Sequence, residues 1–259
     1  RLVDRFGSPG SDFAGYVLSR CGSMIPGIED PGRLVHWAEP LVAAQPDRPW
    51  PRHVLGLAHL RSGQYAAALT DLSQSFLDPA GSLAAGAYNV YGSGSDAPNE
   101  LGNPVIYAHP ALATDAEHKP DATLDNRVLT KLVAVTPRSF SGVTSGWQFT
   151  MYPSNTSSVP IIRNEELILL RAEARWFTGD KPGATADLNL IRTTSGGLAA
   201  IAQPATDAAF ITELLKQRRY SLMFEGGHRW IDARRLNRLT DLALEVAGHI
   251  HVPRFPIPL

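Results

Sequence analysis

The sequence lacks several features that commonly decide a protein's class. It has one cysteine, so an intrachain disulfide is excluded. No stretch approaches the roughly 18 consecutive apolar residues that a membrane-spanning helix needs. The formal net charge is −1, which does not favour nucleic acid or an anionic membrane as a partner. Hydrophobic residues make up 44% of the chain, which is enough for a packed core, so we do not expect global disorder.

Sequence patterns of common anchoring, cofactor and catalytic sites are also missing. The first ten residues, RLVDRFGSPG, contain no apolar signal region. Cys21 follows Arg20, whereas a lipoprotein cleavage site needs a small residue there, so we expect Cys21 not to be lipidated. There is no P-loop, no Gly-x-Ser-x-Gly turn and no zinc-finger spacing. The sequence therefore predicts no cofactor and no enzymatic activity.

Helical periodicity is present, and it occurs in pairs. A helix is predicted over residues 31–45, bent or interrupted at Pro40. Two further helices are predicted within residues 49–79, on either side of Gly63, with the second running to Phe76. Small and large residues here follow the order of a tetratricopeptide repeat. We therefore expect a tetratricopeptide-like hairpin over residues 31–82.

The same pattern returns near residue 165, in NEELILLRAEARWFTGDKPGATADLNLIR. It predicts a helix, a stop at Gly179 and a second helix. The matched residues, at identical spacing, are Gly63, Ala68 and Leu72 in the first hairpin and Gly179, Ala184 and Leu188 in the second. An internal repeat of this kind predicts a mainly α fold of helical hairpins, with residues 161–240 as a C-terminal helical core.

Residues 83–160 have a different composition and predict a long, irregular, loop-rich insertion. They are rich in Gly, Asn, Ser and Pro, with one short β-prone run, WQFTMY. Long loops in compact domains commonly carry function. Aromatic rings beside amides and hydroxyls suit sugars, although each ring could instead pack the insertion onto the helices. The candidate ligand-binding residues are Tyr88, Tyr91, Trp147 and Tyr152.

A long helix is predicted over residues 207–225. Residues 218–235, RRYSLMFEGGHRWIDARR, concentrate charge around a Gly-Gly break. Three functional interpretations of this charged stretch fail. Glu225 and His228 have the Glu-x-x-His spacing of di-iron bundles, but Gly-Gly breaks the helix that such a metal site needs. Acidic residues among the arginines reduce the net positive charge of the stretch, which argues against binding of nucleic acid. The same arginines lower carboxyl pKa values, which argues against a glycosidase acid.

We interpret this stretch as a structural clamp that holds the last helices together. Carboxylates and guanidinium groups at near-helical spacing can link two helices around the Gly-Gly corner, with aromatic residues packed beneath. The residues expected to form the clamp are Phe224, Glu225, Arg229, Trp230, Asp232 and Arg235.

The order RNEELILLRAEARWFTGD, ATADLNLIRTTSGGL, ELLKQRRYSLMFEGGHRWIDARRLNRL and RFPIP resembles the C-terminal half of SusD-like, or RagB-type, proteins. The resemblance covers roughly residues 70–259. It implies a helical outer-membrane lipoprotein, facing the cell surface, that binds a glycan or other oligomeric nutrient, such as a peptide. It implies delivery to a SusC-like TonB-dependent transporter, without catalysis. It also implies that residues 218–235 are a family signature and not the ligand site.

The N-terminal part departs from the resemblance. The lipidated cysteine and the long N-terminal helical segment of SusD-like proteins are not visible in this sequence. We therefore expect one SusD-like domain over residues 1–259 that lacks part of the N-terminal region. The alternative function is a tetratricopeptide-type scaffold that binds a segment of another protein in its concave face.

Overall fold

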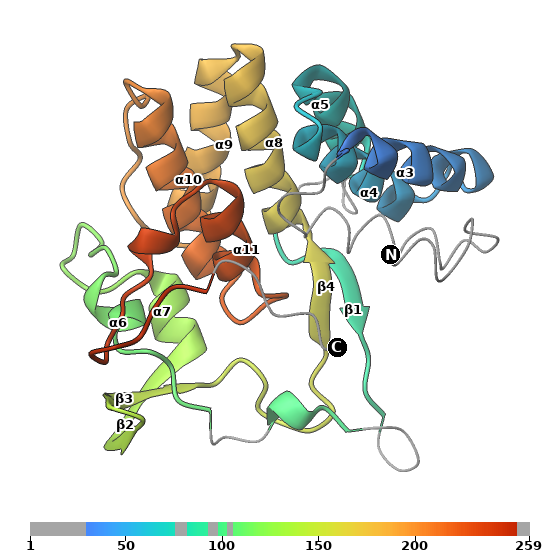
Figure 1. The fold of residues 1–259 in the computed structure, drawn as a ribbon. Coiled ribbons are helices and arrows are strands. Elements are labelled where there is room, and N and C mark those ends of the chain that lie inside the picture. The colour runs from blue at the N-terminus through green and yellow to red at the C-terminus, as the bar shows by residue number, and fades with distance from the viewer. Residues whose placement is uncertain (1–29, 76–81, 93–97, 103–105, 253–259) are drawn as a thin grey trace. The chain divides into compact units, whose positions relative to one another are not determined.

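The computed structural model describes residues 30–75, 82–92, 98–102 and 106–252. Most of the regular structure in them is helical, which confirms the predicted fold class (Figure 1). Cys21, Phe76 and the proline-rich end of the chain lie outside the described residues. None of the helices in these ranges is both long and apolar enough to cross a membrane.

The chain divides into two compact units. The first comprises Arg1–Gly86, Ile162–Asn189 and Ile201–Leu214. The second comprises Ala87–Ile161, Leu190–Ala200 and Leu215–Leu259. The division falls within two helices, after Asn189 and after Leu214, and within two strands, after Gly86 and after Ile161.

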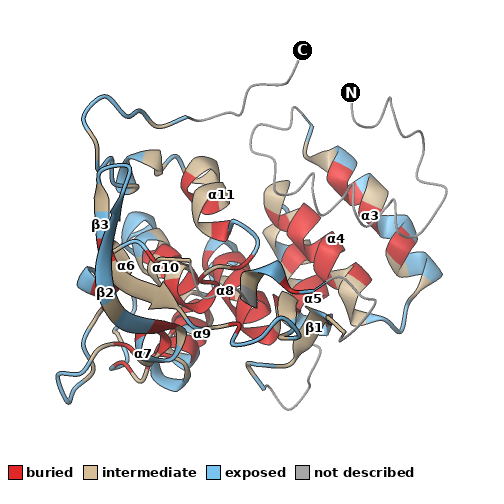
Figure 2. Ribbon diagram, turned by 90° about the horizontal axis from the view of Figure 1, so that it is seen from below, coloured by how far each residue is buried: buried red, intermediate tan, exposed pale blue. Residues whose placement is uncertain are grey.

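The first unit begins with three helices: α3 (Gly32–Ala44), α4 (Pro49–Arg61) and α5 (Tyr65–Gln74). Proline stands at the start of α4, where its missing N–H costs nothing. Gly63 connects α4 to α5 with a φ of 71°, a left-handed conformation that glycine adopts readily. Figure 2 shows buried residues gathered on α4. The two helices predicted on either side of Gly63 are therefore present, and the second ends at Gln74.

The second hairpin consists of α8 (Asn164–Thr178) and α9 (Lys181–Thr194). Gly179 ends α8 in the left-handed region, with a φ of 96°. Arg171 and Arg175 of α8 both donate to the Asp187 carboxylate of α9, at 2.7 and 2.9 Å. The repeat read from the sequence is seen in both hairpins: Gly63 and Gly179 both have positive φ at the corners. The four matched Ala and Leu residues are all fully buried: Ala68, Leu72, Ala184 and Leu188.

The second unit contains more regular structure than the irregular insertion we predicted. Strands β2 (Leu132–Phe140) and β3 (Val143–Phe149) form an antiparallel pair, interrupted between Ala134 and Arg138. Two short helices precede them, α6 (Ala111–Thr114) and α7 (Asn126–Lys131). Strands β1 (Gly86–Asn89) and β4 (Val159–Arg163), most of whose residues belong to this unit, form a second, two-stranded sheet.

The predicted long helix over residues 207–225 is shorter in the structure. Helix α10 spans Asp207–Ser221, and α11 begins at His228 and ends at Arg235. The Lys131 ammonium donates to the carbonyl oxygens of Tyr220 and Ser221, at 2.9 and 2.6 Å, and so satisfies acceptors at the helix end. Phe224 then adopts a φ of 60°, and two glycines with positive φ follow. The chain therefore turns before the Gly-Gly pair is reached.

Candidate ligand-binding pocket

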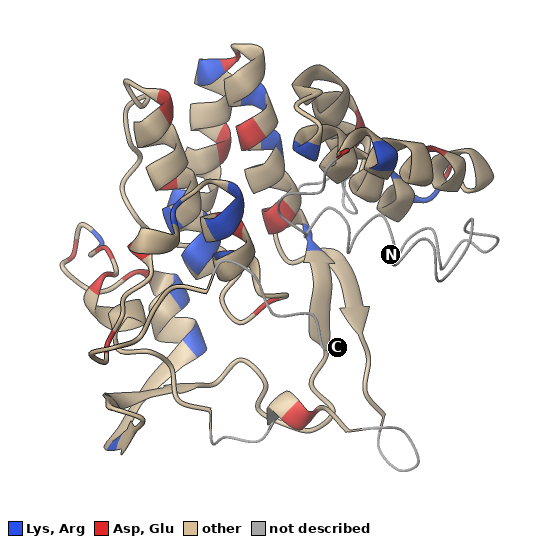
Figure 3. Ribbon diagram, in the orientation of Figure 1, with Lys and Arg blue, Asp and Glu red and all other residues tan. Residues whose placement is uncertain are grey.

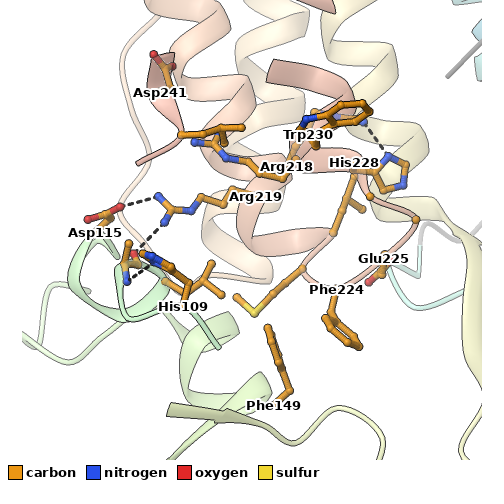
Figure 4. A pocket seen from close by; sticks show the side chains of 18 of the residues that line it. His109, Asp115, Phe149, Arg218, Arg219, Phe224, Glu225, His228, Trp230 and Asp241 are labelled. Carbon is orange, nitrogen blue, oxygen red and sulfur yellow. Dashed lines mark hydrogen bonds and ion pairs between the residues drawn. The ribbon is translucent and has the colours of Figure 1, made fainter. Parts of the chain in front are cut away.

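The turn between α10 and α11 forms one wall of a pocket of about 720 Å³. The other walls come from segments 109–115 and 241–243, with Leu101 and Phe149. All of these residues belong to the second unit. In Figure 4, His109, Asp115 and Arg219 lie together at one side, and Phe149 and Phe224 lie at another. Residues far apart in the sequence therefore converge on one hollow.

Three aromatic rings line the pocket. The rings of Phe149 and Phe224 lie with their centroids 4.6 Å apart. The positive φ of Phe224 belongs to the turn that directs its ring toward Phe149. Trp230 is a further lining residue, and the Arg234 guanidinium lies 4.0 Å from its ring centroid, in cation–π geometry. These half-buried rings offer apolar surface to a ligand.

The pocket is also rich in charge, much of it paired. Figure 3 shows positive residues gathered on α11. The Arg219 guanidinium donates to Asp115 at 2.8 Å and to the Ala111 carbonyl at 2.9 Å. The charged lining residues are Asp115, Arg218, Arg219, Glu225, Arg229 and Asp241.

Asp232 lies behind the lining and is held by two arginines. Its carboxylate accepts from Arg218 Nε at 2.6 Å and from Arg235 Nε at 2.8 Å. Burial alone would raise the pKa of Asp232, but the two guanidinium charges outweigh burial and hold the pKa far below its ordinary value. Asp232 is therefore an ionised link between α10 and α11.

The whole guanidinium group of Arg229 and the Nη1 atom of Arg218 have no hydrogen-bond acceptor within the described residues. The half-buried Arg229 guanidinium makes no hydrogen bond or ion pair within the described part of the chain. Burial and the nearby positive charge of Arg219 lower the pKa of Arg229. Arg218 is 5% exposed, and its buried Nη1 atom likewise has no hydrogen-bond partner among the residues described. These N–H groups can donate to a ligand.

The aromatic residues that we predicted from the sequence do not line this pocket, although the Tyr152 ring centroid lies 6.3 Å from that of Phe224. Tyr88 is half-buried in β1, and Tyr91 is half-buried shortly after it. Trp147 packs against a buried cluster around Val128, and Tyr152 is 8% exposed. None of the four is among the described residues that line the pocket. Their role in ligand binding stays a prediction.

The six expected clamp residues divide into two groups. Asp232 and Arg235 form an ion pair, but the second arginine bound to Asp232 is Arg218, which we did not predict. The other four residues line the pocket: Phe224, Glu225, Arg229 and Trp230. The ranges that the structure describes contain no cluster of three or more metal-ligating side chains.

A sequence model of the SusD family matches residues 117–248, just over half of the chain. This protein belongs to the SusD family. Members of the family bind ligands and are not catalytic. The SusD-type match includes the turn between α10 and α11 and most of the charged lining of the pocket. No curated protein sequence matches the chain significantly.

Solved SusD-type structures share the fold at low sequence identity. A SusD superfamily protein from Bacteroides vulgatus aligns with a TM-score of 0.60 and 16% identity, over 81% of this chain and 58% of its own. A SusD-like carbohydrate-binding protein from the same species aligns with a TM-score of 0.57 and 17% identity, over 80% of this chain and 51% of its own. A laminarin-binding SusD-like protein aligns with a TM-score of 0.53 and 15% identity, over 84% of this chain and 64% of its own. The chain thus spans between half and two thirds of these structures' length.

Proposed function

We propose that this SusD-family protein binds a saccharide non-covalently in the pocket of its second unit. We further propose that it acts at the surface of the bacterial outer membrane and delivers the saccharide to a SusC-like TonB-dependent transporter. Membership of the family supports both parts of the proposal. Two proteins with the same fold are described as carbohydrate-binding and laminarin-binding, which supports a saccharide as the ligand.

The observation that carries the proposal is the combination of rings and charged groups in one pocket. A volume of about 720 Å³ lies within the roughly 300–1,000 Å³ typical of small-molecule sites. Phe149, Phe224 and Trp230 supply ring surface that can pack on the C–H faces of a sugar. Carboxylate and guanidinium groups at the same pocket can bind hydroxyl groups. Both kinds of contact are needed, because a sugar presents both kinds of surface.

The charges around the pocket support binding without bond cleavage. A glycosidase needs one carboxylic acid that holds a proton at working pH. Here Asp232 has a lowered pKa, and Asp115 and Asp241 accept from Arg219 and Arg238 at 2.8 and 2.7 Å. Acids held by guanidinium groups favour a binding role.

Isothermal titration calorimetry on a panel of oligosaccharides tests the proposal, and one pair of variants locates the site. We expect at least one oligosaccharide to bind. Trp230→Ala removes pocket surface and should weaken binding about tenfold, the equivalent of roughly 1.4 kcal/mol. Tyr91→Ala removes a half-buried aromatic residue of the same unit outside the pocket and should leave the affinity unchanged.

The outcomes separate the pocket from the loop site predicted from the sequence. If Tyr91→Ala abolishes binding and Trp230→Ala does not, the ligand binds the loop aromatics and the pocket assignment is wrong. If no saccharide binds, the proposed function is wrong. Thermal unfolding of both variants must first show that they remain folded at the titration temperature.

A further inference from the structure

We infer that the ligand of this pocket is a saccharide that carries a carboxylate, such as an oligomer of a uronic acid, and that Arg229 and Arg218 bind the carboxylate. The inference rests on the proposed saccharide-binding function and names the ligand class. It depends on which charges of the pocket are already paired and which are not.

The paired arginines account for most of the acids around the pocket. Arg219 holds Asp115, and Arg218 donates through Nε to Asp232. Asp241 accepts from Arg238, on the exposed side of the turn after α11. Arg229 is the arginine at the pocket that these acids leave without an ion pair within the described residues. A half-buried cation without a partner favours an anion from outside the chain.

Arg218 gives a second, independent indication. The residue is 5% exposed and lines the pocket, and its Nη1 atom is buried without a hydrogen-bond partner among the described residues. Its Nη2 atom lies 3.4 Å from His228 Nδ1 (Figure 4). A buried N–H group without an acceptor is costly, so an acceptor supplied by a ligand would satisfy it. A carboxylate offers two acceptor oxygens in a plane, which suits guanidinium groups.

The position of Arg229 is unfavourable for a merely structural arginine. It lies in the first turn of α11, where the positive end of the helix dipole disfavours a cation. The charge of Arg219 and partial burial disfavour it further. The charges of Asp241 and Asp232 offset only part of these effects, because the pKa of Arg229 is still lowered. An anion bound beside Arg229 would be attracted by both guanidinium groups and by the positive end of the helix dipole.

The rings decide in favour of an acidic sugar over a small free anion. An inorganic anion would use the guanidinium groups and leave Phe149, Phe224 and Trp230 in contact with water. An acidic saccharide meets both parts of the pocket, with its ring against the aromatic residues and its carboxylate against the arginines.

Calorimetry with acids and their methyl esters tests the inference, because esterification removes the charge and keeps the sugar skeleton. Trisaccharides of galacturonic, glucuronic and mannuronic acid would each be compared with the fully esterified form. We expect at least one acid to bind at least tenfold more tightly than its ester. Arg229→Gln should reduce that ratio to near one. Arg138→Gln, an exposed arginine of β2 outside the pocket, is the matched control and should keep the ratio.

Unfolding experiments provide a second readout for the same variant. Because Arg229 has no partner in the described chain, Arg229→Gln should unfold at the same temperature as the wild type or higher. A clear loss of stability would show that Arg229 is a structural residue and would overturn the inference.

The outcomes distinguish this inference from the proposed function. If neutral sugars or esters bind as tightly as every acid, or if Arg229→Gln leaves the acid preference intact, the inference is wrong and saccharide binding stands. If neither neutral nor acidic saccharides bind, both are wrong.

Discussion

At the scale of single residues, two ion pairs with similar geometry differ in how deeply they are buried. Asp232 and Asp241 each accept from an arginine Nε three residues away, at 2.8 and 2.7 Å. Asp232 is 2% exposed and also binds Arg218, whereas the Arg238–Asp241 pair is exposed to water. Removing one partner of a buried pair leaves the other charge buried and uncompensated, while an exposed pair contributes little.

We therefore predict that Asp232→Asn lowers the free energy of unfolding by about 3 kcal/mol at pH 7. The lowered pKa of Asp232 means that its contribution is complete above the unfolded-state carboxyl pKa of about 4 and is lost as the pH falls toward the folded-state pKa. The difference between wild type and variant should therefore shrink below about pH 4, by up to roughly 1.4 kcal/mol per pH unit. Urea unfolding at several pH values measures both quantities.

Asp241→Asn is the control for this prediction, because it changes the same residue type in a pair of similar length. It should lower the free energy of unfolding by less than about 1 kcal/mol at every pH. Equal effects of the two variants, or a difference that does not change with pH, would contradict the clamp role of Asp232.

At the scale of helices and strands, the elements with local signals could be predicted from the sequence. Glycine marks both hairpin corners, and Ala and Leu at fixed offsets mark the contact faces. In the β2–β3 pair only β3 had a signal, because residues 147–149 belong to the β-prone run WQFTMY. Strand β2 had none, because most of it is exposed on both faces and Pro137 interrupts it, so apolar and polar residues do not alternate. The end of α10 was missed because it depends on Lys131, 90 residues away from Ser221.

The corner of the first hairpin gives a test at this scale. Gly63 has a φ of 71°, and a Cβ placed there would meet no atom within 4 Å, so only backbone strain should matter. We predict that Gly63→Ala lowers the free energy of unfolding by about 1–2 kcal/mol, and that Gly63→Asn lowers it less, because asparagine tolerates this conformation. Thermal unfolding ranks the three proteins. An alanine variant as stable as the wild type would contradict a left-handed corner.

At the scale of the whole molecule, more of the fold than of the site could be predicted from the sequence. The family resemblance rested on four sequence segments between residues 163 and 258, which can be recognised by their order along the chain. The pocket instead requires segments 109–115, 218–230 and 241–243 to meet, and no spacing within the sequence encodes that meeting. The same limit hid Arg218 as the partner of Asp232, because 14 residues and a turn separate them. The sequence signal for the pocket was the group of arginines beside aromatic residues in 218–235. That pattern is typical of a structural clamp as much as of a binding site.

The division into two units predicts that stability and binding can be changed separately. Every lining residue of the pocket belongs to the second unit, whereas Gly63 belongs to the first. A loss of about 1–2 kcal/mol from a typical 5–15 kcal/mol leaves more than roughly 99% of the protein folded. Gly63→Ala should therefore lower the unfolding temperature and leave the calorimetric Kd unchanged, whereas Trp230→Ala should raise the Kd about tenfold. A raised Kd in Gly63→Ala, measured well below its unfolding temperature, would show that ligand affinity depends on the first hairpin as well.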